Sequence, residues 1–300
     1  MRHRTALLLT SLLVGAVTAG PVGALSEFGM EGSHVVSSAA DEIRASVSPD
    51  GRRIVWGRRG PGDAVGRSEL WQARLVEGRW QHAAPLSINA GGVDSSPAFS
   101  ADGHWLYFVS DREGGFGGDD LYRSEVLPGD GYGTPQNLGP AVNTAADERS
   151  PAPGADGRWL MFASAGHGGA GGSDLLAARW DGSVLGAARA LPGINSDAGE
   201  FDGVWLGDGE AVVFARTSAA AGGAPTQLHL ARCDGGRYGP AEPLALSFNT
   251  ADGTTLAPGM DWSKPRELLV TGSARSPRAG GLDIYRMRAP AADGSRDCLD

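Results

Sequence analysis

Four carboxylates recur along the chain at nearly equal intervals of 52, 54 and 52 residues, and the next repeat has a hydroxyl at the matching position: Glu42, Asp94, Glu148, Glu200 and Thr254. Carboxylates that share one place repel each other, which raises some of their pKa values or recruits a cation. Oxygen ligands favour Ca²⁺ or Mg²⁺ over zinc, so Ca²⁺ is the only cofactor that the sequence suggests. The alternative is that each acid accepts hydrogen bonds from a turn or from a neighbouring backbone.

A second set of charged residues marks the loops between apolar runs. Asp120, Asp174 and Asp283 each begin a run, and Arg112 follows the most regular run. These residues, beside the Gly-rich segments 114–118 and 168–172, are candidates for a binding surface made of loops. The alternative is structural, with the acids bonded to loop backbone and Arg112 paired with a nearby loop acid in an exposed salt bridge of small value.

Sequence signatures of enzymes are mostly missing. The chain has no Gly-x-Ser-x-Gly segment, and the five histidines after residue 24 are isolated from one another. A glycosidase needs two carboxylates at a set separation, which the recurring acids would supply. We therefore expect a non-catalytic protein and keep a carbohydrate-active one, either a lectin or a glycoside hydrolase, as the alternative.

Cys233 and Cys298 are the only two cysteines of the chain. In an oxidising compartment they either pair or remain free thiols. A disulfide would hold the C-terminal tail, residues 291–300, which would otherwise fray.

The candidate residues sit in a repeated frame. Asp-Gly turns recur at residues 50–51, 102–103, 156–157 and 208–209, and a longer turn takes their place at 260–265. Short apolar runs follow at 54–56, 105–109, 159–163, 211–215 and 268–270. They do not alternate with polar residues, which is typical of strands covered on both faces. Each of the first four units holds four short runs, the number of strands in a propeller blade.

The repeat predicts an all-β, five-bladed β-propeller of four-stranded blades. The blades are expected at about 41–89, 90–143, 144–195, 196–249 and 250–290. The last blade lacks a fourth run, and residues 32–36 precede Ser37, which is in register with a recurring asparagine: Asn89, Asn143, Asn195 and Asn249. We therefore expect residues 32–36 to supply the missing strand and close the ring, because closure removes exposed sheet edges. In such a ring the recurring acids, which precede the inner strands, should crowd the mouth of the central channel.

Two segments carry a family resemblance: SPAFSADGHWLYFVSDR at 96–112 and GGFGGDDLY at 114–122. Together they resemble the TolB-like, WD-like Pro-Asp repeat of bacterial envelope propellers. The resemblance implies a periplasmic or envelope propeller that acts by binding other proteins or envelope components. TolB itself has six blades and a preceding domain, so membership of the Tol system does not follow.

Residues 1–24 are typical of a secretory signal peptide. Arg2 and Arg4 precede an apolar run from Ala6 to Val14, and Val22-Gly23-Ala24 suits cleavage after Ala24. A membrane anchor is the alternative, but the run is shorter than the ~20 residues of a spanning helix. We expect a periplasmic or secreted protein with no membrane span.

Net charge limits the partners. The formal charge is −9, and loss of the two arginines of residues 1–24 makes it −11. Such a chain repels nucleic acid and anionic lipid, and favours a cationic partner or a metal ion. We expect a monomer whose partner is a protein or a cell-envelope component, with no nucleic acid involved.

Overall fold

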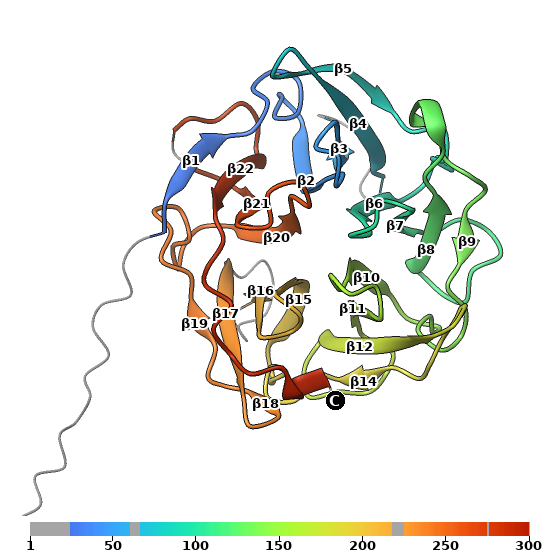
Figure 1. Ribbon diagram of the computed structural model, residues 1–300, viewed down its shortest axis with the longest axis vertical. Coiled ribbons are helices and arrows are strands. Elements are labelled where there is room, and N and C mark those ends of the chain that lie inside the picture. The colour runs from blue at the N-terminus through green and yellow to red at the C-terminus, as the bar shows by residue number, and fades with distance from the viewer. Residues whose placement is uncertain (1–24, 61–66, 218–224, 275, 300) are drawn as a thin grey trace, which may run out of the picture.

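The computed structural model describes residues 25–60, 67–217, 225–274 and 276–299. Five antiparallel sheets surround a central axis (Figure 1). The helices in these ranges are two short 3-10 turns, η1 (Pro128–Asp130) and η2 (Asp297–Leu299). The predicted five-bladed β-propeller is therefore confirmed. The predicted signal peptide, residues 1–24, lies outside the described residues.

Each blade begins with the strand nearest the axis and runs outward. The first blade is β2 (Asp41–Val47), β3 (Arg53–Arg59), β4 (Glu69–Val76) and β5 (Arg79–Pro85). The second is β6 (Asp94–Phe99), β7 (Trp105–Ser110), β8 (Asp120–Glu125) and β9 (Gln136–Asn137). The third is β10 (Glu148–Pro153), β11 (Trp159–Ser164) and β12 (Asp174–Asp181), with an outer strand in two pieces, β13 (Val184–Leu185) and β14 (Arg189–Ala190).

The last two blades follow the same plan. The fourth is β15 (Gly199–Leu206), β16 (Ala211–Thr217) and β17 (Thr226–Asp234), again with a divided outer strand, β18 (Arg237–Tyr238) and β19 (Glu242–Pro243). The fifth is β20 (Thr255–Met260), β21 (Glu267–Gly272), β22 (Asp283–Arg288) and, as its outer strand, β1 (Glu27–Met30).

The hydrophobic core lies between neighbouring blades. One cluster packs Tyr107 and Val109 of the second blade against Leu160 and Phe162 of the third, and all four are almost fully buried. A strand between two such layers is covered on both faces, which explains why the apolar runs do not alternate with polar residues.

Links join the outer strand of one blade to the inner strand of the next, and a polar side chain clasps each link to the preceding blade. Asn143 Oδ1 accepts from Leu121 N at 2.8 Å, and its Nδ2 donates to Leu121 O at 3.0 Å. Asn89, Asn195 and Asn249 make the same pair of bonds to Leu70, Leu175 and Leu228. Each asparagine therefore bonds both backbone groups of one leucine in the third strand of its blade. The leucine carbonyl also accepts a backbone bond, as Leu121 O does from Leu138 N at 3.0 Å.

Closure by an N-terminal strand is confirmed, but the predicted residues are wrong. The closing strand is β1, whose Met30 pairs with Tyr285 of β22, whereas residues 32–36 form a turn in which Val36 N donates to Gly32 O. Ser37 takes the asparagine role, because its Oγ accepts from Ile284 N at 3.1 Å. The register inferred for Ser37 is therefore right, but residues 32–36 correspond to a link and not to a strand.

The C-terminal segment crosses the fourth blade and is tied to it. Cys233 of β17 and Cys298 of η2 form a disulfide, with Cα atoms 5.9 Å apart. Ser295 N also donates to Cys233 O at 2.8 Å. The tail is therefore part of the folded structure.

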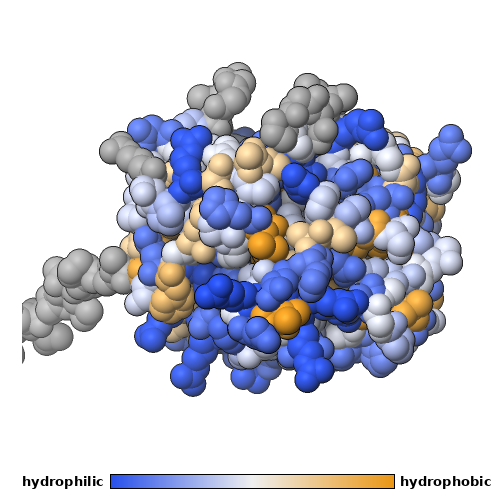
Figure 2. All heavy atoms as spheres, turned by 90° about the horizontal axis from the view of Figure 1, so that it is seen from above, coloured by the Kyte–Doolittle hydropathy of each residue, from blue (hydrophilic) through white to orange (hydrophobic). Residues whose placement is uncertain are grey.

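The outer surface is mixed in character. Hydrophilic side chains dominate the side that Figure 2 shows, and apolar ones are scattered among them. Within the described ranges, no helix has the length and hydropathy needed to cross a bilayer.

Candidate functional site

The four recurring acids cap the links. Each carboxylate accepts a hydrogen bond from the backbone N–H four residues earlier, at 2.5–3.0 Å: Ser38 to Glu42, Ala90 to Asp94, Thr144 to Glu148 and Ser196 to Glu200. All four acids have no exposed surface. The regular spacing therefore reflects a turn that is built in the same way at each link.

The expectation that these acids crowd the channel opening is wrong. Their carboxylates lie inside the links between blades, and none of them lines the cavity at the channel opening. Of the described residues, the one group with three possible metal-ligand side chains contains Cys233 and Cys298, which are bonded to each other. The acids are satisfied by their own links, so a shared cation is not needed to explain them.

The fifth position of this series is Thr255 and not Thr254. Thr255 pairs with Gly272 in the ladder where Glu148 pairs with Ser164, and its hydroxyl donates to Phe248 O at 3.0 Å. The last link has one residue more than the others, which shifts the register by one.

Side chains in or just after the second strand of a blade bond to three of the four acids. Arg112 reaches Asp94 at 2.7 Å, Ser164 Oγ reaches Glu148 at 2.7 Å, and Arg216 reaches Glu200 at 2.8 Å. Arg112 is mostly buried here and its partner is a link acid, so the predicted exposed salt bridge is a partly buried one. For Glu42, the hydrogen bonds come from Ser38, and burial raises its pKa to about 7.

The acids that begin the third strands cap the loops before them. Phe116 N donates to Asp120 at 2.6 Å, and Ala279 N donates to Asp283 at 2.9 Å, each four residues back. Burial raises the pKa of Asp174, whose Oδ1 has no hydrogen-bond partner in the described structure. The contacts of Asp120 and Asp283 therefore match the structural alternative.

The innermost strand of each blade contains a β-bulge two residues after the buried link residue. Together these bulges form a ring that was not predicted from the sequence. The bulge residues have positive φ without being glycine: Arg44, Ser96, Ser150, Asp202 and Ala257, with φ from 49 to 56°. Each sits where the ladder register shifts in an innermost strand. A bulge re-aims a side chain, here on the strands around the axis. The fixed two-residue offset from the link acids is the sequence signal that could have located these bulges.

Arg44 joins three blades at the centre of the ring. Its side chain is 2% exposed, and Nη1 lies 3.8 Å from Asp202 Oδ1 of the fourth blade. Nη2 donates to Pro151 O of the third blade at 2.9 Å. Ser150 Oγ donates to the same carboxylate oxygen of Asp202. Arg44 Nε has no hydrogen-bond partner in the described structure, and burial lowers the pKa of Arg44.

A cavity of about 270 Å³ opens at this level on the face that carries the links, and we call it the channel mouth. Ser96, Ser150 and Asp202 of the bulge ring line it, with four arginines and one further acid around them: Arg58, Arg59, Arg67, Arg149 and Asp119. The mouth is therefore rich in cations although the whole chain is acidic.

The arginines of the mouth differ in how they are held. The Arg58 guanidinium stacks 4.3 Å from the centre of the Trp71 ring. Arg59 pairs with Asp41 at 2.7 Å, and Arg149 with Asp119 at 3.3 Å. Arg67 is exposed and its side chain makes no hydrogen bond or ion pair with any described residue. The mouth therefore combines fixed and uncommitted positive charge.

Comparisons with known proteins come from structure alone. No family model and no curated protein matches the chain. An endo-arabinase from Bacteroides thetaiotaomicron is similar at TM-score 0.53 with 13% identity, over 89% of this chain and 99% of that one. A protein of unknown function from Dyadobacter fermentans is similar at TM-score 0.52 with 12% identity, over 90% and 100%.

TolB from Acinetobacter baumannii is also similar, at TM-score 0.48 with 13% identity over 92% of this chain. The chain spans 66% of the length of that TolB. What the chain shares with these structures is the β-propeller fold. Because one fold carries many functions, the site has to be judged from its own residues.

Proposed function

We propose that this protein is an exported, non-catalytic binding module whose channel mouth takes an anionic group of a protein or cell-envelope component. The proposal rests on the arginine-rich mouth described above. Exposed loops and links on a rigid propeller form a fixed surface for a partner, as binding sites commonly do.

Charge supports an anionic ligand at this place. Asp202 is buried and faces Arg44, so it contributes little free negative charge to the mouth. Among the described residues, Arg67 has no hydrogen-bond or ion-pair partner, and the buried Nε of Arg58 has no hydrogen-bond partner. The guanidinium fork suits carboxylates and phosphates. The net charge of the chain favours a cationic partner, but screening limits its reach to about 8–10 Å, so local charge decides at the mouth.

The experiment compares Arg67→Ala/Arg149→Ala with wild type in a titration with poly-L-glutamate. Each lost charge-assisted contact contributes about 1.5–3 kcal/mol, so we expect Kd to rise at least about tenfold. A matched control removes two exposed arginines elsewhere, Arg52→Ala/Arg79→Ala, and should leave Kd unchanged. Absence of poly-L-glutamate binding by wild type, or an equal loss in the control, would contradict the proposal.

A carbohydrate-active propeller is the second candidate, and one observation favours it. Two carboxylates, Asp119 and Asp202, line the same mouth. Burial raises the pKa of Asp119, which suits a general acid, whereas Asp202 faces Arg44. Glu148 and Glu200, the acids first considered for this role, are fully buried.

Turnover of a glycan panel separates the two candidates. If the second is right, wild type turns over a glycan and Asp119→Asn and Asp202→Asn abolish that turnover. A wild type that is inactive on the panel while it binds poly-L-glutamate favours the binding module.

A further inference from the structure

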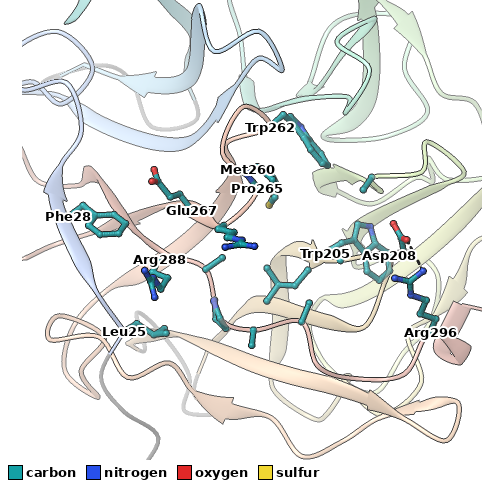
Figure 3. A pocket seen from close by; sticks show the side chains of 18 residues that line it. Leu25, Phe28, Trp205, Asp208, Met260, Trp262, Pro265, Glu267, Arg288 and Arg296 are labelled. Atoms are coloured by element: carbon teal, nitrogen blue, oxygen red, sulfur yellow. Dashed lines mark ion pairs between the residues drawn. The ribbon is translucent and has the colours of Figure 1, made fainter. Parts of the chain in front are cut away.

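A cavity of about 830 Å³ lies on the opposite face, which carries the Asp-Gly turns. Its walls come from β1, the ends of β15 and β20, the turn after β20 and the C-terminal segment. Figure 3 shows Leu25 and Phe28 at one side and Trp205, Asp208 and Arg296 at the other. A cavity of this size suits a small organic molecule.

The walls are apolar, and their polar atoms are already used. Trp205 Nε1 donates to Ala152 O at 3.1 Å, and Trp262 Nε1 donates to Phe99 O at 2.7 Å. Both indoles therefore have no free N–H to offer to the cavity. Leu206, Met260 and Phe28 add aliphatic and aromatic surface, and Phe28 is 53% exposed. Such walls favour a hydrocarbon chain over a polyhydroxylated ligand.

The charges at the rim leave two free cations. Asp208 pairs with Arg296 at 3.3 Å, and Glu267 pairs with Arg286 at 2.7 Å. Arg266 and Arg288 are exposed and make no side-chain hydrogen bond or ion pair with any described residue. The uncompensated charge beside the apolar walls is therefore positive.

We propose that this cavity binds one molecule with an acyl chain and an anionic head group. The chain lies against Trp205, Met260 and Phe28, and the head group is held by Arg266 and Arg288. The ligand is a monomer taken from solution, because the cavity is concave and its walls converge from five segments. This site is independent of the channel mouth, which lies on the other face.

The disulfide completes the cavity. Pro290, Ala291 and Ala292 form one wall, and this stretch is held by Ala289 N, which donates to Arg266 O at 2.8 Å, and by the Cys233–Cys298 bond. Gly294 passes so close to the fourth blade that a Cβ would lie 2.1 Å from Glu210 O. The wall therefore depends on a tail that is covalently anchored.

The test is calorimetric titration of the full exported chain with decanoate, decanol and decylammonium. We expect decanoate to bind at one saturable site, more tightly than decanol, with decylammonium the weakest. Lengthening the chain should improve affinity about fourfold per methylene until the cavity is full.

Variants assign the site. Arg266→Ala/Arg288→Ala should weaken decanoate at least about tenfold and leave decanol unchanged, and Arg266→Lys should keep most of the affinity. Arg79→Ala, a matched exposed arginine on β5, should behave as wild type. Equal binding of decylammonium, an unchanged double variant, or binding to anionic phosphatidylglycerol vesicles without binding of decanoate would overturn the proposal.

Discussion

Arg44 Nη1 lies 3.8 Å from Asp202 Oδ1, and this buried pair links the first and fourth blades across the axis of the ring. The same guanidinium donates to Pro151 O of the third blade, so one side chain contacts two blades that are not its neighbours. The floor of the channel mouth is therefore built by residues that are far apart in sequence.

Replacement of Arg44 should strongly destabilise the protein. Arg44→Met leaves Asp202 buried without its counter-charge, which costs about 3–5 kcal/mol. We expect Arg44→Met/Asp202→Leu to be less destabilised than the single variant, because it removes both charges. Urea unfolding followed by tryptophan fluorescence measures both, and a single variant within 1 kcal/mol of wild type would show that the pair does not hold the ring.

Glu42 should make stability depend on pH. Its pKa in the folded state is about 7, above the ordinary value of 4.5, so the folded protein binds more protons between these values. The free energy of unfolding should therefore fall as pH rises from about 4.5 to 7. Glu42→Gln keeps an acceptor for Ser38 N and removes the titration. Melting temperatures between pH 5 and 8 should decline less steeply in this variant, and identical slopes would argue against Glu42.

The asparagine clasps should each stabilise the ring. Asn143→Ala leaves Leu121 N without its hydrogen-bond partner in a buried place, at a cost of about 1–3 kcal/mol, whereas Leu121 O keeps the bond from Leu138 N. Because Ser37 performs this role in the last blade, Asn143→Ser should recover part of the loss. Equilibrium unfolding in urea provides the comparison, and equal losses in both variants would show that the hydroxyl cannot replace the amide here.

Loss of the disulfide should increase the motion of the C-terminal segment more than it destabilises the propeller. The bond closes a separation of 65 residues, so Cys233→Ser/Cys298→Ser should lower the free energy of unfolding by about 2–4 kcal/mol. Hydrogen exchange should quicken in residues 289–299, and decanoate binding should weaken. Reduced wild type is the control and should match the variant. An unchanged exchange rate in that segment would mean that packing alone holds it.

The fold could be predicted from the sequence because the repeat itself encodes it. The apolar runs occur in all five blades, and the Asp-Gly turns and link acids in four of them. Each of these features reflects hydrogen bonding or burial within its own repeat. The residues of the candidate site were predicted less well than the fold. Glu148 was expected at the channel opening, but its neighbour Ser150 lines that opening, because the carboxylate of Glu148 turns back to cap Thr144.

By itself, the sequence determined the number of blades, the order of strands and the register of Ser37 with the recurring asparagines, because these follow from the repeat. Only the tertiary structure decided which strand closes the ring, which residues meet at the axis, and how the C-terminal segment forms one side of a cavity. Such contacts join residues more than a hundred positions apart, as Arg44 and Asp202 do. Local patterns do not specify them, because they depend on how all five blades close around one axis.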